Sequence, residues 1–156
     1  MIKCIAVDDE PLALEQLTGY IARVPFLQLI ASCQDAFSAM QVLSEEEVDL
    51  MFVDIHMPDL NGLDLVRSLV VKPLIVFTTA YPEYAVEGFK VDAVDYLLKP
   101  FEFQDLLKPI RHVGNLSIIC KITGEGRKLI YWKRTVHCSL SPNIRLSASM
   151  WQTFAI

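Results

Sequence analysis

The fold of this 156-residue chain is decided by residues 50–62, which read Leu50-Met51-Phe52-Val53-Asp54-Ile55-His56-Met57-Pro58-Asp59-Leu60-Asn61-Gly62. An apolar run of strand length ends in one carboxylate, and a turn-forming segment rich in proline, asparagine and glycine follows at once. Continuous apolarity over a short run predicts a strand buried on both faces, as in a parallel sheet covered by helices. Asp54 is therefore expected at the carboxyl end of a buried strand, where open α/β sheets bind their ligands.

The segments around residues 50–62 repeat a strand–helix alternation. Apolar runs predict strands at 2–7, 27–33, 48–54, 73–79 and 93–98. Apolar residues at helical spacing predict helices from Pro11 until Pro25 stops the first, from an N-cap at Asp35 to the acidic run 45–47, at 63–70, at 82–90, and at 103–113, where Pro109 bends the last helix or ends it early. Four residues of the second helix are expected to face the core: Phe37, Met40, Val42 and Leu43. Five such units predict a parallel sheet with right-handed crossovers and helices on both faces.

Composition limits the class of protein. The chain is 53% hydrophobic and 21% charged, which is typical of a globular domain and argues against disorder. No apolar run reaches the ~20 residues that span a bilayer, and the amino terminus turns acidic too soon for a signal peptide, so we expect a cytoplasmic protein without membrane contact. The four cysteines are scattered without a Cys-x-x-Cys pair, which favours ordinary reduced thiols over a metal site or a disulfide framework.

The charge is unevenly distributed along the chain. Residues 1–113 carry a net charge of −10 and residues 114–156 a net charge of +5, which indicates a domain boundary near Gly114. In the basic C-terminal extension, residues 114–156, β-prone runs at 116–123 and 129–137 flank a glycine-rich turn and predict a hairpin. Trp132, Trp151 and the basic charge are a weak signal for nucleic-acid contact, and a solvated hairpin is the simpler interpretation.

Polar residues follow four of the predicted strands. Asp8 and Asp9 end the first, Asp54 ends the third, and Lys99 ends the fifth, while the fourth carries two hydroxyls, Thr78 and Thr79. If these strands are neighbours, the groups converge on one pocket. Clustered carboxylates resist ionisation unless a cation lies among them, and Mg²⁺ prefers carboxylate oxygens and water. A carboxylate can accept a phosphoryl group, and a lysine and a hydroxyl can bind the phosphoryl oxygens.

Each of these residues also has an ordinary structural interpretation. An Asp-Asp pair after a strand is often a turn with an N-cap, an aspartate at a strand end is often a cap, and Lys99 alone is often a solvated strand end. Threonine is common in strands. The conjunction of all of them in a five-unit α/β pattern is what favours a phosphoryl-transfer site.

Four motifs resemble those of the receiver domain of two-component response regulators. They are Val7-Asp8-Asp9-Glu10-Pro11, the stretch 52–62, Phe77-Thr78-Thr79-Ala80, and Asp95-Tyr96-Leu97-Leu98-Lys99-Pro100-Phe101. The resemblance spans residues 1 to about 113, and the segments 81–89 and 93–98 are most similar to the LytTR (LytR/AlgR) group. It implies a CheY-like (flavodoxin-like) doubly wound five-stranded parallel sheet of order 2-1-3-4-5, followed by a short C-terminal extension.

The resemblance also implies the ligands of a Mg²⁺ ion. Carried over by position, Asp54 is the phosphoacceptor and Asp9 is a direct metal ligand. Asp8 holds metal-bound water, and the main-chain carbonyl of His56 is a further ligand. The His56 side chain either overhangs the pocket, where it could tune the phosphoryl lifetime, or is a solvated loop histidine.

Further residues match the switching machinery of the family. Thr79 corresponds to the switch hydroxyl, and Thr78 is the weaker candidate for that role. Tyr96 corresponds to the aromatic residue that moves inward on phosphorylation, unless it is ordinary strand packing. Lys99 pairs with the phosphoryl group, and the bond between Lys99 and Pro100 is cis in this family.

The resemblance implies a signalling switch rather than an enzyme with an external substrate. A sensor histidine kinase passes a phosphoryl group to Asp54, and activation favours a homodimer through the face of the fourth helix, fifth strand and fifth helix, to control an output such as transcription.

Two alternatives remain. An Mg²⁺-dependent aspartyl-phosphate phosphatase or phosphotransferase typically needs an Asp-x-Asp pair after the first strand, whereas Asp8 and Asp9 are adjacent. A phosphorylation-independent interaction module would not need the intact set. Residues 116–156 do not match the DNA-binding domain that LytTR regulators carry, so residues 114–156 are interpreted either as a basic extension that forms a hairpin or as a truncated or altered effector region. DNA binding is expected only with a full effector domain.

Overall fold

The computed structural model describes residues 1–83 and 93–123, with only the helix backbone for 114–123. In chain order the elements are β1 (Ile2–Val7), α1 (Pro11–Ala22), β2 (Leu27–Cys33), α2 (Ala36–Glu45), β3 (Leu50–Asp54), α3 (Gly62–Ser68), β4 (Leu74–Thr79), β5 (Asp95–Leu98) and α5 (Phe103–Thr123). The predicted helix at 82–90 falls almost wholly in 84–92, outside the described residues.

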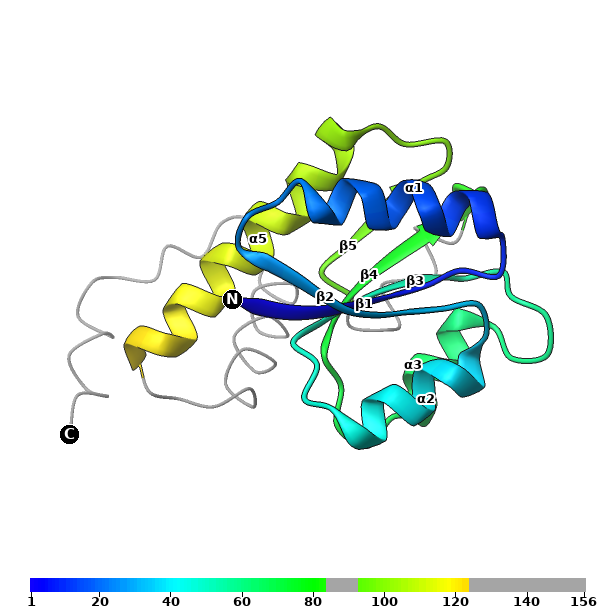
Figure 1. Ribbon diagram of the computed structural model, residues 1–156, viewed down its shortest axis with the longest axis horizontal. Helices are drawn as coiled ribbons and strands as arrows, with labels where there is room; N and C mark the ends of the chain where they lie inside the picture. The colour runs from blue at the N-terminus through cyan, green and yellow to red at the C-terminus, as the bar shows by residue number, and fades with distance from the viewer. Residues whose placement is uncertain (84–92, 124–156) are drawn as a thin grey trace, which may run out of the picture. The chain divides into compact units, whose positions relative to one another are not determined.

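The strands form one parallel sheet of order β2-β1-β3-β4-β5, which confirms the predicted fold. Helices α1 and α5 cover one face of the sheet, and α2 and α3 cover the other (Figure 1). The chain moves outward from β1 to β2 and then crosses to β3 on the other side of β1. The strand order therefore reverses at β1 and β3, and the carboxyl ends of these two strands flank the switch point where α/β sheets bind ligands.

The central strand β3 is buried along its whole length, as predicted. Its side chains alternate between the two layers: Met51 and Val53 belong to the core under α2 and α3, whereas Leu50 and Phe52 belong to the core under α1 and α5. This period of two places the Asp54 side chain in line with Phe52, on the α1/α5 side of the sheet.

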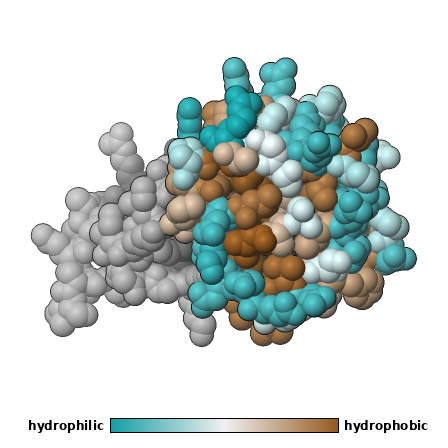
Figure 2. All heavy atoms as spheres, in the orientation of Figure 1, coloured by the Kyte–Doolittle hydropathy of each residue, from teal (hydrophilic) through white to brown (hydrophobic). Residues whose placement is uncertain are grey.

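Strand β2 forms one edge of the sheet and is less buried than β3. Its end residues Leu27 and Cys33 are buried, whereas the residues between them are partly or fully exposed. In the view of Figure 2, apolar surface lies in the middle of the domain, where β2 runs in Figure 1, and hydrophilic side chains surround it. The difference follows from position, because an edge strand has only one neighbour to shield it.

The helices begin where local chemistry satisfies their free N–H groups. Pro11 occupies the first turn of α1, where its missing N–H costs nothing. Asp35 caps α2 as predicted, accepting a hydrogen bond from the Ser38 N–H at 2.7 Å. Asn61 caps α3 by accepting from the Asp64 N–H at 2.9 Å.

The prediction for the buried face of α2 was wrong for its two largest side chains. Phe37 is 64% exposed and Met40 37% exposed, whereas Ala36 and Ala39 are buried and Val42 and Leu43 partly buried. Residues adjacent in a helix differ by about 100° in direction. Because the two alanines face the sheet, the residues that follow each of them turn toward solvent.

The prediction of a β-strand at 116–123 was also wrong, because α5 continues to Thr123. Pro109 lies inside this helix and does not end it. Leu106 and Ile110, on either side of Pro109, are buried in the core, and this packing holds both parts of the helix in place. Extending an existing helix adds one hydrogen bond per residue without a new nucleation cost, which outweighs a modest β preference. The second predicted strand, 129–137, lies outside the described residues.

The chain divides into two compact units, Met1–Asn115 and Leu116–Ile156, and the division falls within α5. The functional assignment of residues 114–156 as a separate extension stays a prediction. In the described part of the chain, none of the helices is long and apolar enough to cross a membrane.

Gly62 begins α3 directly against the end of β3. Its N–H donates to the Ile55 carbonyl at 3.0 Å, and a side-chain carbon at this position would collide with the Asp54 carbonyl group. Asp59, in the same turn, has a positive φ of 69°, a conformation that aspartate tolerates better than most residues. Glycine is therefore required at position 62 for the turn to pass this close to Asp54.

We expect Gly62→Ala to lower the free energy of unfolding by about 1–3 kcal/mol, because the new methyl group must displace backbone. Gly19→Ala is the matched control: the exposed Gly19 in α1 has open space around its Cα, so alanine should raise stability by about 0.5–1 kcal/mol. Urea unfolding of the three proteins measures both changes, and equal effects at the two positions would contradict the close approach.

Candidate functional site

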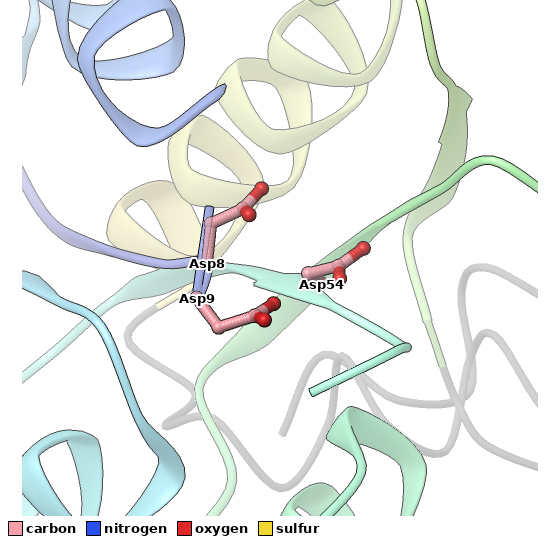
Figure 3. Close-up of side chains that lie close together, drawn as sticks. All are labelled: Asp8, Asp9 and Asp54. Atoms are coloured by element: carbon pink, nitrogen blue, oxygen red, sulfur yellow. The ribbon is translucent and has the colours of Figure 1, made fainter. Parts of the chain in front are cut away.

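Three carboxylates meet at the carboxyl edge of the sheet. Asp8 and Asp9 follow β1 and Asp54 ends β3, and one oxygen from each lies within 4.8 Å of the others. Figure 3 shows the three side chains extending from the adjacent strand ends toward the same side. Asp8 and Asp54 are buried, with exposed fractions of 1% and 5%. The predicted convergence of the acidic residues is thus present in the fold.

Lys99, after β5, supplies a positive charge to this cluster. Its Nζ lies 2.7 Å from Oδ2 of Asp8 and 3.3 Å from Oδ1 of Asp54. Burial by itself would lower the pKa of Lys99, but the hydrogen bond to Asp8 and the charge of Asp54 raise it overall. The lysine is therefore held as an ammonium ion that bridges two of the three acids.

Asp54 is the carboxyl group most affected by this environment. Burial raises the pKa of Asp54 to about 6, the neighbouring charge of Asp8 adds to the rise, and Lys99 opposes it. A carboxylate with this pKa is largely ionised near pH 7 and is easily protonated just below it. Such a group is poised to act as a nucleophile at neutral pH.

Thr79 ends β4, His56 follows β3, and both contact Tyr81. The Thr79 hydroxyl accepts a hydrogen bond from the Tyr81 N–H at 3.1 Å, so the hydroxyl is tied to the loop that follows β4. The exposed His56 ring packs against the Tyr81 ring, with centroids 4.6 Å apart. Tyr81 therefore contacts both Thr79 and His56, which the sequence did not lead us to predict. The one feature of the sequence that pointed to Tyr81 was its position, two residues after Thr79.

Tyr96 and Pro100 complete the set of predicted residues. The Tyr96 ring stacks on Phe77 of the neighbouring strand, with centroids 5.4 Å apart and planes at 22°, and its hydroxyl oxygen is buried. Tyr96 packs on the α2/α3 side of the sheet, opposite to Asp54. The Lys99–Pro100 bond is cis, as the family resemblance implied.

The donor set of this cluster fits a magnesium ion. Mg²⁺ binds oxygen at 2.0–2.1 Å, so two of its ligands lie at most about 4.2 Å apart. Carboxylate oxygens within 4.8 Å of one another need to move only slightly to reach this spacing. Asp9 and Asp54 would be direct ligands, and Asp8 would hold a water bound to the ion. The cation would relieve the charge repulsion that, together with burial, raises the pKa of Asp54.

Comparison with protein families identifies the domain. Residues 4–111 match the response regulator receiver domain. The chain is 39% identical over 115 residues to an uncharacterised response regulatory protein of Shewanella oneidensis, covering 72% of this chain and 49% of that protein. It is 39% identical over 109 residues to the sensory transduction protein LytT of Enterococcus faecalis, covering 68% and 45%. The chain thus spans about half the length of these curated relatives.

A solved structure shows the same fold. The response regulatory domain of the protein mrkE from Klebsiella pneumoniae superposes with a TM-score of 0.67 at 33% identity, covering 73% of this chain and 96% of that one. A response regulator receiver domain protein from Clostridium thermocellum gives the same TM-score at 21% identity. The second likeness supports the fold alone.

The raised pKa of Asp54 predicts a pH-dependent cost to stability. An acid with a raised folded-state pKa stabilises the fold where it is protonated, so wild type should lose this contribution as the pH rises from about 4 to about 6. Asp54→Asn cannot ionise. Urea unfolding in the presence of a metal chelator measures the stability of both proteins. The stability of Asp54→Asn relative to wild type should increase across that pH range and then level off. A pH-independent difference would contradict the shift.

Lys99 and Mg²⁺ should compete for the same oxygens. Replacing Lys99 with methionine removes the ammonium group from Asp8 and Asp54, so Mg²⁺ affinity measured by calorimetry should rise by about tenfold or more. Lys108→Met is the matched control, because Lys108 is 72% exposed and pairs with Asp105. Unchanged or weaker Mg²⁺ binding by Lys99→Met would show that the lysine does not occupy the cation position.

Proposed function

Since the chain belongs to the response regulator receiver family, we propose that it accepts a phosphoryl group on Asp54 from a sensor histidine kinase and acts as a conformational switch. One observation supports this most directly: Lys99 bridges the buried Asp8 and Asp54 at the switch point of the sheet. The arrangement combines a nucleophilic carboxylate with charge that can neutralise a transferred phosphoryl group.

In the proposed reaction an Asp54 oxygen attacks the phosphorus atom of a phosphohistidine. A phosphorus–oxygen bond forms as the phosphorus–nitrogen bond breaks, and the electron pair stays on the imidazole. Lys99 turns from Asp8 toward the new phosphoryl oxygens, which it binds as a point charge. Asp9, Asp54 and the His56 carbonyl would hold Mg²⁺, and Asp8 would hold a water bound to it. The ion would supply positive charge for the phosphoryl oxygens.

The switch is proposed to act through Thr79. The Thr79 hydroxyl accepts a hydrogen bond from the Tyr81 N–H and can at the same time donate its own hydrogen to the phosphoryl group. A movement of Thr79 toward that group would therefore pull on the loop after β4. Tyr96, which stacks on Phe77 of β4, is proposed to follow this movement. A local change in charge thereby biases a two-state element.

The output surface is proposed to include β5 and α5. The helix predicted at 82–90, which the family resemblance adds to this surface, lies outside the described residues. Leu98 is 48% exposed on β5, and a pocket of about 260 Å³ lies between Asp95–Leu98 and the Asp105–Pro109 turn of α5. A second copy of the chain would cover this surface on activation. Control of transcription is the output we propose for a protein with an effector domain, since one relative is the transcriptional regulatory protein BtsR of Salmonella typhi.

The phosphoacceptor can be identified by labelling. The full chain, incubated with Mg²⁺ and radiolabelled acetyl phosphate, should acquire a base-labile acyl phosphate, and Asp54→Asn should lose it completely. Asp59→Asn is the matched control, since Asp59 is exposed in the adjacent turn and should be labelled like wild type.

Other outcomes would favour the alternatives. Labelling that persists in Asp54→Asn would remove Asp54 from the reaction. Wild type that takes up no label with any donor would support an interaction module, and steady hydrolysis of external phosphomonoesters would support a phosphatase.

A further inference from the structure

Thr78 carries a buried hydroxyl that the proposed function does not use. The residue is fully buried, and among the described residues its Oγ1 has no hydrogen-bond partner. Folded proteins rarely leave a buried hydroxyl unpaired, because the group gives up its bonds to water. Valine has nearly the same shape without this cost, so the threonine calls for a functional explanation.

The register of the sheet places Thr78 beside the phosphoacceptor. Thr78 on β4 is paired with Asp54 on β3, and neighbouring strands are about 4.8 Å apart. The paired residues that precede them, Phe52 and Val76, lie on the α1/α5 side, so the alternation of side chains puts Thr78 and Asp54 on that side too. Both belong to the floor of the site.

The opposite neighbour of Thr78 cannot satisfy its hydroxyl. On β5 Thr78 is paired with Leu97, which is buried and apolar. Asp54 is therefore the polar group next to Thr78 in this row of the sheet. In the unphosphorylated protein its Oδ1 is already engaged by Lys99.

We propose that Thr78 is a positioning residue for the proposed phosphoryl reaction, and that its hydroxyl donates a hydrogen bond to the Asp54 carboxyl oxygen that does not carry phosphorus. Phosphorylation draws Lys99 toward the phosphoryl oxygens. The second Asp54 oxygen, which would also bind Mg²⁺, keeps a lone pair that can accept a hydrogen bond from Thr78. The Thr78 hydroxyl lies one strand away and has no bond of its own to break. A rotation about its side-chain bond would turn the hydroxyl toward Asp54.

This hydrogen bond affects how long the phosphoryl group persists. In hydrolysis a water oxygen attacks phosphorus, the bond from phosphorus to Asp54 breaks, and its electron pair stays on the Asp54 carboxylate, while the water protons leave with inorganic phosphate or solvent. The Asp54 oxygen gains negative charge during this step, and hydrogen bonds to charged acceptors are stronger than those to neutral ones. Thr78 therefore favours the transition state over the acyl phosphate and accelerates dephosphorylation.

The test compares Thr78→Val, Thr78→Ser and wild type as full chains. After labelling with acetyl phosphate and removal of the donor, Thr78→Val should lose its phosphoryl group about fivefold more slowly, the factor expected when a hydrogen bond to a developing charge is lost. Thr78→Ser keeps the hydroxyl and should restore a rate near that of wild type. Thr18→Val, on the partly exposed Thr18 of α1, is the control and should leave the rate unchanged.

A second measurement separates this role from simple packing. The unphosphorylated Thr78→Val protein should unfold at a higher temperature than wild type, because valine removes an unpaired buried hydroxyl. Greater stability together with slower hydrolysis supports the proposal. Hydrolysis unchanged in Thr78→Val, or equally slow in Thr78→Ser, overturns it. Failure of wild type to take up label would instead refute the proposed function on which this inference rests.

Discussion

The repulsion among three carboxylates is the constraint on which the site depends. Asp8, Asp9 and Asp54 have oxygens within 4.8 Å of one another, and two of these side chains are buried, so a cation among them lowers the electrostatic cost of the cluster. Lys99 supplies one positive charge, which leaves the cluster negative. This residual charge favours the binding of Mg²⁺. Burial is the main cause of the raised pKa of Asp54, and the charges of Asp8 and Asp9 raise it further.

The surrounding structure maintains this costly arrangement in two ways. The core residues of β3, Leu50 to Val53, are fully buried and fix the position of Asp54 from below, while Gly62 lets the following turn pass against its backbone. A functional site of this kind lowers the stability of the fold where its charges and hydroxyls are poorly paired. The ionised Asp54 and the unpaired Thr78 hydroxyl are two such groups, and both lie on the α1/α5 side of the same strand ends.

The sequence was sufficient for the fold where the apolar pattern was unambiguous. The runs that became β1, β3 and β4 end in polar residues, and strand-length apolarity between helical segments allows few other arrangements. The apolar pattern did not show which face of a helix is buried, because a shift of one residue along the helix changes that face, as at Phe37 and Met40. It also failed at 116–123, where a β-prone run continues an existing helix. In both cases the competing structures differ little in local energy, so packing and helix propagation decide.

The sequence by itself determined the order of strands and helices and the identity of the residues at the strand ends, including Asp8, Asp54, Thr79 and Lys99, because apolar periodicity and turn chemistry are local properties. Only the tertiary structure decided which of these groups contact one another. Three contacts depend on strand register and side-chain direction. Lys99 bridges Asp8 and Asp54, Tyr81 links Thr79 to His56, and the unpaired Thr78 lies beside Asp54. Register and side-chain direction are properties of neighbouring strands, which lie far apart in the chain.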